Sequence, residues 1–174
     1  KKDSGSIKLN SEDVSSKNIS ERSNLGLSYL PQEASIFRKL TVKENIMTSL
    51  EQRKDLKSDS IGLELNALLE EFNLNEFSDT LGIKLSGGER RRTEIARSLG
   101  SDPRFILLDE PFAGIDPIAV SDLKNTIKQL KAKKIGVLIS DHNVRDTMQI
   151  CDQVLIINQG KLIAKGKPEE VSKD

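Results

Sequence analysis

Two apolar runs of the sequence each end in polar residues that could promote attack by water. The run 105–108 continues into Asp109 and Glu110, and the run 137–139 is followed within three residues by His142. Because the carboxyl ends of parallel strands hold the ligands of α/β sheets, we expect these side chains to lie at one sheet edge. Side chains alternate along a strand, so the two adjacent carboxylates should point in opposite directions. That arrangement suits one metal ligand and one base.

A pair of glycines follows a helix start signal earlier in the chain. Ser86 and Glu89 have the spacing of a capping box, and Gly87 and Gly88 between them let a ligand approach the backbone closely. The start of such a helix can bind an anion. Taken alone, the pattern is more typical of an ordinary capped helix, and the three arginines that follow are more typical of a solvated helical face.

The elements that must position these residues alternate between strand and helix. This alternation predicts a parallel sheet with right-handed crossovers, and hence an α/β fold. A segment with helical periodicity begins at the capping box of Thr41 and Glu44 and lies ahead of Ser86. We expect strands at 6–9, 25–30, 105–108 and 137–139, helices at 86–99, 118–133 and 143–151, a hairpin at 154–164 and a polar tail from 168.

The composition limits the classes of partner and compartment. Lys and Arg number 27 and so do Asp and Glu, so net charge gives no bulk attraction to nucleic acid or anionic lipid. The longest apolar runs are far shorter than the roughly 20 residues that span a bilayer. A single cysteine, Cys151, and the lack of a Cys/His cluster favour a reducing compartment such as the cytoplasm.

In their order and spacing, these motifs resemble those of the ATP-binding cassette (ABC) family of transporter ATPases. The resemblance covers nearly the whole chain, including the helical segment. Gln32 resembles the Q-loop glutamine, 85–89 the family signature, Asp109 the Walker B acid, Glu110 the catalytic glutamate, 113–116 the D-loop and His142 the switch histidine.

The resemblance implies a P-loop NTPase-like core with a parallel sheet and a helical subdomain. On that basis we expect a remainder of the N-terminal part with the Q-loop at 1–40 and a helical subdomain at 41–85. The signature helix, Walker B strand, D-loop, switch histidine and C-terminal hairpin should occupy 86–174.

The resemblance also implies the cofactors ATP and Mg²⁺ and a homodimer that sandwiches the nucleotide. Asp109 and Gln32 would then contact the metal, Glu110 would polarise the attacking water, and His142 would steady the γ-phosphate. Contacts to ATP are implied for Gln32, Ser86, Gly87, Gly88, Glu89 and Asp116.

The phosphate-binding loop of such ATPases, Gly-x-x-x-x-Gly-Lys-[Ser/Thr], does not occur in the sequence. The nearest candidate starts at Gly160 but has Pro168 where the hydroxyl belongs, and it lies in the predicted terminal hairpin. We therefore expect the N-terminal part of the fold to be truncated and the 174-residue chain itself to be inactive, and we expect the full-length protein to be the ATPase.

Longer stretches around the motifs, at 29–38, 85–92, 109–117 and 141–145, resemble the ATPase subunits of lipopolysaccharide export systems. This implies inner-membrane transporter subunits as partners and a peripheral location on the cytoplasmic face of that membrane. Phe37 and Arg38 would contact those partners, although core packing is an equal reading for Phe37. The alternatives are a branched-chain amino-acid importer, a cassette that acts on DNA or ribosomes, or a non-hydrolytic binding module.

Overall fold

A three-stranded parallel sheet lies at the centre of the structure, a computed structural model in which residues 4–172 are described. Its strands are β3 (Leu27–Leu30), β4 (Phe105–Asp109) and β5 (Gly136–Ser140), in that spatial order. Leu30 lies opposite Leu108, and Asp109 lies opposite Ser140. The carboxyl ends of all three strands therefore reach one edge, which confirms the predicted α/β fold with a parallel sheet.

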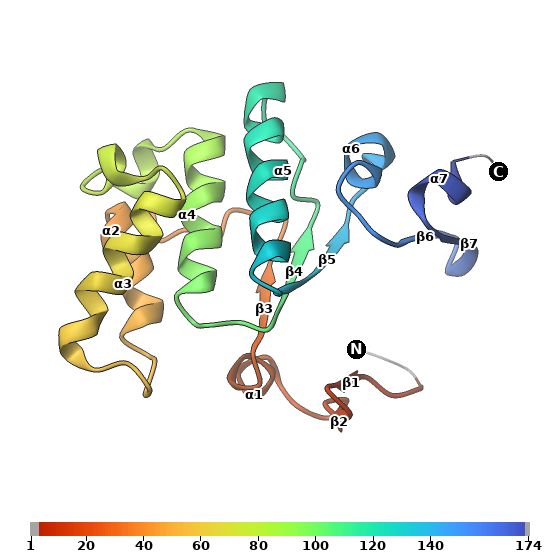
Figure 1. The fold of residues 1–174 in the computed structure, drawn as a ribbon, viewed down its shortest axis with the longest axis horizontal. Coiled ribbons are helices and arrows are strands. Elements are labelled where there is room, and N and C mark those ends of the chain that lie inside the picture. Colours follow the sequence, from red (N-terminus) through yellow and green to blue (C-terminus); the bar gives the residue numbers. More distant parts are fainter. Residues whose placement is uncertain (1–3, 173–174) are drawn as a thin grey trace.

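Two long helices connect the sheet with the rest of the core. Figure 1 shows α4 (Gly87–Leu99) and α5 (Pro117–Ala132) side by side, with α4 against β3 and α5 against β5. A Cβ atom at Gly88 would lie 3.0 Å from Cβ of Ala119, so a glycine is what allows the two helix starts to come this close. The short helix α6 (Val144–Met148) follows β5.

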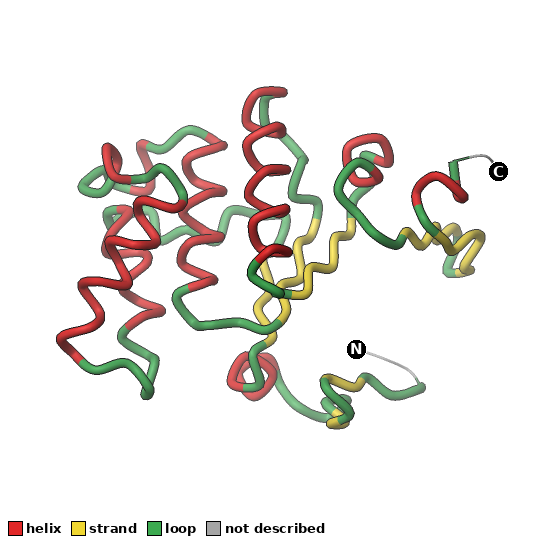
Figure 2. The backbone as a smooth tube through the Cα atoms, in the orientation of Figure 1, coloured by secondary structure: helices red, strands yellow, loops and turns green. Residues whose placement is uncertain are grey.

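The segment between β3 and α4 is helical, as predicted. It contains α2 (Val42–Leu50), α3 (Ser58–Glu71) and the 3₁₀ turns Asn75–Phe77 and Gly82–Lys84 (Figure 2). The predicted capping box at Thr41 is present, because Glu44 accepts a hydrogen bond from the Thr41 backbone N–H at 2.7 Å.

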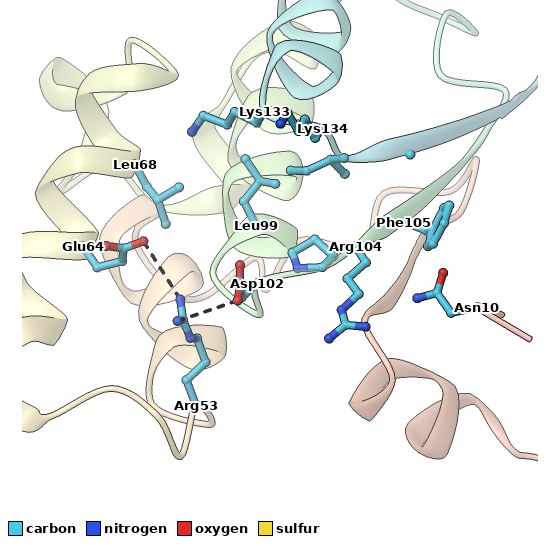
Figure 3. Close-up of a pocket in the computed structure, with 13 residues that line it drawn as sticks. Asn10, Arg53, Glu64, Leu68, Leu99, Asp102, Arg104, Phe105, Lys133 and Lys134 are labelled. Carbon is cyan, nitrogen blue, oxygen red and sulfur yellow. Dashed lines mark ion pairs between the residues drawn. The ribbon is translucent and has the colours of Figure 1, made fainter. Parts of the chain in front are cut away.

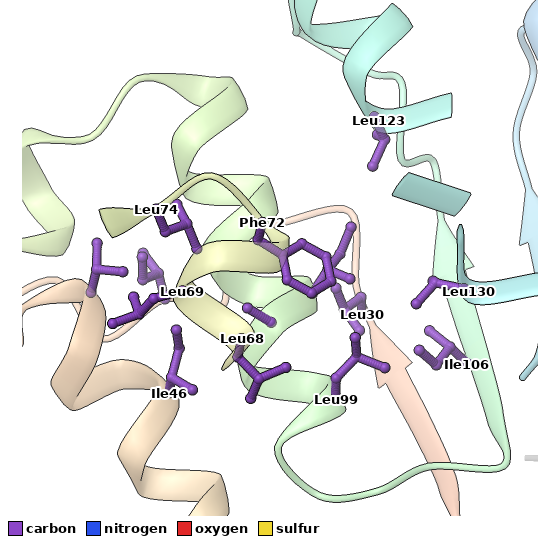
Figure 4. Packing of buried hydrophobic residues seen from close by; sticks show 14 of the residues in the cluster. Leu30, Ile46, Leu68, Leu69, Phe72, Leu74, Leu99, Ile106, Leu123 and Leu130 are labelled. Atoms are coloured by element: carbon purple, nitrogen blue, oxygen red, sulfur yellow. The ribbon is translucent and has the colours of Figure 1, made fainter. Parts of the chain in front are cut away.

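One hydrophobic cluster joins this helical segment to the sheet. Ile46 and Leu68 from the helical segment belong to the same buried cluster as Leu30, Ile106 and Leu130 (Figure 4). Burying a side chain of this size contributes about 1.5–3 kcal/mol. Because one core continues from the helical segment into the sheet, packing marks no boundary at residue 40 or 85. The division of the chain at these residues therefore stays a prediction.

Short elements surround the sheet. At the N-terminal side, β1 (Lys8–Leu9) pairs with β2 (Glu12–Asp13) ahead of α1 (Ile19–Asn24). At the other side, β6 (Val154–Asn158) and β7 (Lys161–Gly166) form the predicted hairpin, and the expected polar tail folds into α7 (Pro168–Val171).

The helices of residues 4–172 include none with the length and apolar character that a membrane span requires.

Candidate functional site

Three predicted site residues meet at the carboxyl edge of the sheet. Gln32, two residues after β3, donates from Nε2 to Oε2 of Glu110 at 2.8 Å. Nδ1 of His142, which follows β5, lies 3.4 Å from the same oxygen. The Glu110 side chain is 32% exposed and that of His142 is 74% exposed, so water can reach the Glu110 carboxylate.

The backbone at Glu110 is unusual, and its side chain has other partners than that of Asp109. Glu110 has a φ of 40°, in the left-handed region that residues other than glycine rarely adopt, and its N–H donates to the Ser140 carbonyl at 2.7 Å. Strain of this kind often accompanies functional sites. Asp109 instead accepts a hydrogen bond from the Tyr29 hydroxyl at 3.1 Å. The two adjacent carboxylates therefore have different partners, although Glu110 lies just beyond the end of β4, where strand alternation no longer applies.

Tyr29 was not predicted as a site residue. It lies on β3 beside Leu107 of β4, so its ring reaches along the sheet toward the strand end. The hydrogen bond to Asp109, with burial and the negative charge as smaller causes, raises the pKa of the Tyr29 hydroxyl. The phenol therefore stays protonated and remains a donor to the carboxylate.

The loops that follow β4 and β5 are tied together by Asp141. Its side chain is 0% exposed and accepts hydrogen bonds from the backbone N–H of Phe112 at 3.2 Å and of Asn143 at 2.7 Å. Two backbone donors stabilise a buried carboxylate that would otherwise be costly. This carboxylate fixes the loop after Glu110 relative to His142. In the sequence, the only sign that Asp141 could connect these loops is its position directly before His142.

The glycine pair lies at the start of α4, as predicted. The Ser86 hydroxyl accepts from the Glu89 N–H at 3.3 Å, and Glu89 accepts from the Ser86 N–H at 2.8 Å, which completes the capping box. A Cβ atom at Gly87 would lie 3.5 Å from Ile115, so the helix start adjoins the D-loop segment. Asp116 caps α5 by accepting hydrogen bonds from two N–H groups of its first turn, each at 3.0 Å.

Within residues 4–172, no hydrogen bond or ion pair joins the α4 start directly to the side chain of Glu110 or His142. One copy of the chain thus presents two separate groups of predicted site residues. The first is Gln32, Asp109, Glu110 and His142, and the second is Ser86, Gly87, Gly88, Glu89 and Asp116.

The donor set at the strand ends fits magnesium. Asp109 and Gln32 offer carboxylate and amide oxygens, which Mg²⁺ prefers, and Mg²⁺ in nucleotide sites needs only one or two protein ligands besides water and phosphates. Within the described chain, no group of three or more His, Cys, Asp or Glu residues is arranged to hold a metal by itself. The site therefore suits a metal that arrives with a phosphate ligand.

Of the two predicted partner-contact residues, Arg38 lines a small surface groove and Phe37 lies next to it in the chain. Phe37 is 50% exposed, and the guanidinium of Arg97 lies 4.9 Å from its ring centroid, a cation–π contact. Arg38 lines this groove, of about 180 Å³, together with Ile36 and Ile83. Phe37 is thus half-exposed and outside the buried cluster, which favours the contact reading over core packing.

A larger pocket, of about 580 Å³, lies at the opposite end of the sheet (Figure 3). Its cationic side chains include Arg53, which pairs with Asp55 at 2.5 Å and lies 4.0 Å from both Glu64 and Asp102. It also contains Arg104. None of the predicted site residues lines this pocket, so its size does not mark the site.

Comparison with known proteins assigns the chain to a family. The profile of the ABC transporter family matches residues 1–113, more than half of the chain. The chain belongs to this family. The matched range spans Gln32, residues 85–89 and β4 with Glu110.

Curated relatives of the cassette cover its whole length. The lipopolysaccharide export system ATP-binding protein LptB of Haemophilus influenzae is 53% identical over 174 residues, which are 100% of this chain and 72% of that protein. LptB of Escherichia coli K12 is 49% identical over 173 residues, with 99% and 72% covered. These relatives are named as ATP-binding proteins of an export system.

Solved structures confirm the fold of the cassette. An ATP-binding cassette of an ABC transporter in its ADP conformation superposes with a TM-score of 0.85 at 28% identity, over 98% of this chain and 72% of that one. A nucleotide-free cassette superposes with a TM-score of 0.83, also at 28% identity.

Proposed function

We propose that this chain is the ATP-hydrolysing part of an ABC transporter ATPase that drives lipopolysaccharide export from the inner membrane. The observation that carries the hydrolytic part is the meeting of Gln32 and His142 on one oxygen of Glu110. The names of the relatives in Haemophilus influenzae and Escherichia coli support the export part.

Glu110 is the group that would activate the attacking water. Its Oε2 can accept a proton from water, while the Gln32 amide holds the carboxylate in place by a hydrogen bond. A positioned base of this kind contributes about 10²–10⁴ in rate. His142 can donate from its ring to a phosphate oxygen, because its side chain is mostly exposed beside Glu110. Positioning and charge stabilisation supply most of the catalysis in phosphoryl transfer.

Asp109 and Gln32 are the residues that would hold Mg²⁺. When bound, Mg²⁺ neutralises negative charge on the phosphates. Tyr29 keeps the Asp109 carboxylate in one orientation through its hydroxyl. Glu110 accepts a hydrogen bond from the Gln32 amide nitrogen and not from Tyr29, and its carboxylate stays available as the base.

The signature group would act on the nucleotide held by a second copy. Ser86 and the N–H groups of Gly87 and Gly88 lie at the start of α4, where unpaired N–H groups and the helix dipole favour an anion. Because no hydrogen bond or ion pair within residues 4–172 joins this group to the side chains of Glu110 or His142, we expect a head-to-tail homodimer to bring the two groups to the same phosphate. Asp116 and Glu89 shape this surface by capping α5 and α4.

The membrane partners would dock beside the Q-loop. Arg38 lines the groove and the half-exposed Phe37 precedes it in the segment that follows Gln32, so a helix of a membrane subunit could contact both from the cytoplasmic face. The proposed location is thus peripheral, on the cytoplasmic face of the inner membrane.

Hydrolysis can be tested with a fusion in which this chain replaces the matching 72% of the Haemophilus influenzae relative. The remaining part of that protein is expected to supply the phosphate loop, whose motif does not occur in the sequence here. We expect the fusion to hydrolyse Mg-ATP and the 174-residue chain alone to release no phosphate. An inactive fusion beside an active parent protein would contradict the catalytic assignment.

The export role can be tested in a strain that depends on the relative. We expect the fusion to sustain lipopolysaccharide transport and to copurify with the inner-membrane export subunits. Active ATPase without copurification or transport would instead favour an importer of the branched-chain amino-acid type.

A further inference from the structure

A buried ion pair on α4 holds the backbone on both sides of Gln32. Glu94 is 3% exposed and Arg91 is 8% exposed, and Nη1 of Arg91 lies 3.2 Å from Oε2 of Glu94. The same Nη1 donates to the carbonyl of Pro31 at 3.1 Å, directly before Gln32. The pair therefore contacts the Q-loop as well as its own helix.

The other oxygen of Glu94 holds the segment after Gln32. Its Oε1 accepts hydrogen bonds from the backbone N–H of Ser35 at 2.6 Å and of Ile36 at 3.1 Å. Hydrogen bonds to a charged acceptor are stronger than those between neutral groups. Neither N–H belongs to a regular helix or strand, so this carboxylate replaces the backbone partner that a loop lacks.

From this geometry we infer that Glu94 is a positioning residue for ATP hydrolysis, and that it acts by fixing the loop that presents Gln32 to Glu110. The inference rests on the proposed function. Within residues 4–172, no hydrogen bond or ion pair joins Glu94 to Glu110 or His142, so its effect is expected to pass through the loop that carries Gln32. The helix that begins with the signature serine is thereby connected to the base of the catalytic group.

The two oxygens of Glu94 allow a sharp test in the fusion. Glu94→Ala removes the acceptor of the Ser35 and Ile36 N–H groups. It also leaves the buried Arg91 without its counter-ion, which is destabilising. Glu94→Gln loses the charge that pairs with Arg91 but keeps one oxygen able to accept from Ser35 and Ile36. We expect Glu94→Ala to lower kcat at least tenfold with the KM for ATP within twofold, and Glu94→Gln to recover most of kcat.

A double-mutant comparison separates positioning from general destabilisation. If Glu94 acts through Gln32, adding Glu94→Ala to a Gln32→Ala fusion should lower kcat less than twofold further. Equal kcat losses in Glu94→Ala and Glu94→Gln, or full additivity with Gln32→Ala, would overturn the inference. Melting temperatures from circular dichroism show whether each variant is folded.

Failure of the proposed function gives a different result. In that case the unmutated fusion would not hydrolyse ATP. An active fusion with normal kcat in Glu94→Ala would overturn only the role of Glu94.

Discussion

Gln32 and Glu110, which are 78 residues apart in the sequence, are joined by a hydrogen bond of 2.8 Å between Nε2 and Oε2. The bond crosses from the end of β3 to the end of β4, which are neighbours in the sheet. It links the loop beside the proposed partner groove to the proposed base. A movement of that loop would therefore change the position of the carboxylate that activates water.

Replacing the base should stop hydrolysis without stopping binding. In the fusion, we expect Glu110→Gln to lower kcat by about 10²–10⁴, because an amide cannot take a proton from water. ATP binding should remain, since Asp109 and the signature group are unchanged. Phosphate release and equilibrium binding of a labelled ATP measure the two properties. Glu76→Gln, at an exposed position in the helical segment, is the matched control. Normal turnover by Glu110→Gln would refute the role of Glu110 as the base.

Substitutions at Ser86 should separate helix capping from phosphate contact. Ser86→Ala removes the N-cap of α4 and should cost about 1 kcal/mol in the free energy of unfolding. Ser86→Asp keeps a good cap, so its stability should match that of the parent fusion. Its negative charge should nevertheless abolish hydrolysis by repelling the phosphate. Urea unfolding and ATPase assays on the same preparations give both values, and an active Ser86→Asp fusion would count against phosphate contact.

The sequence predicted most of the elements and the three residues that meet at the sheet edge. Their motifs are local, and parallel strands bring their carboxyl ends together whatever the intervening chain. Tyr29 and Asp141 were missed as supporting residues because their partners, Asp109 and the Phe112 N–H, lie in other segments. Hydrogen bonds across strands depend on register, which no local pattern specifies.

A similar limit applies to Glu94. On a helix that carries three consecutive arginines, a glutamate three residues from Arg91 predicts an exposed ion pair along the helix. The structure instead buries the pair against the Q-loop. Burial arises from tertiary packing, so the periodicity of one helix could not show which charges face inward.

Truncating Phe37 should affect partner binding more than catalysis. Phe37→Ala in the fusion removes a half-exposed ring beside the groove but none of the groups around Glu110. We expect ATP hydrolysis by the isolated fusion to stay within twofold, and copurification with the inner-membrane subunits to fall at least tenfold. Leu63→Ala, at a 73% exposed position on α3, is the control for loss of an exposed apolar side chain. Equal loss of partner binding in both variants would remove the special role of Phe37.

The ion pair between Lys124 and Asp146 should make stability depend on pH. Lys124 donates to Asp146 at 2.5 Å, and Asn143 donates to its other oxygen at 2.6 Å. These two hydrogen bonds, with that of Lys124 the larger cause, lower the pKa of Asp146 below its ordinary value of about 3.9. The folded state therefore holds the carboxylate ionised more strongly than the unfolded state does, and the resulting stability is present above about pH 4.

As the pH falls through the lowered pKa, this stability should be lost because Asp146 becomes protonated in both states. We expect Asp146→Asn in the fusion to lower the free energy of unfolding near pH 7 and to lower it progressively less toward pH 3. Gln149→Ala removes a neutral acceptor of the same Lys124 amine, at 2.7 Å, and should leave the pH profile parallel to that of the parent. Urea unfolding from pH 3 to 7 gives the comparison. A difference for Asp146→Asn that stays constant or grows as the pH falls would show that the ion pair does not stabilise the fold through the charge of Asp146.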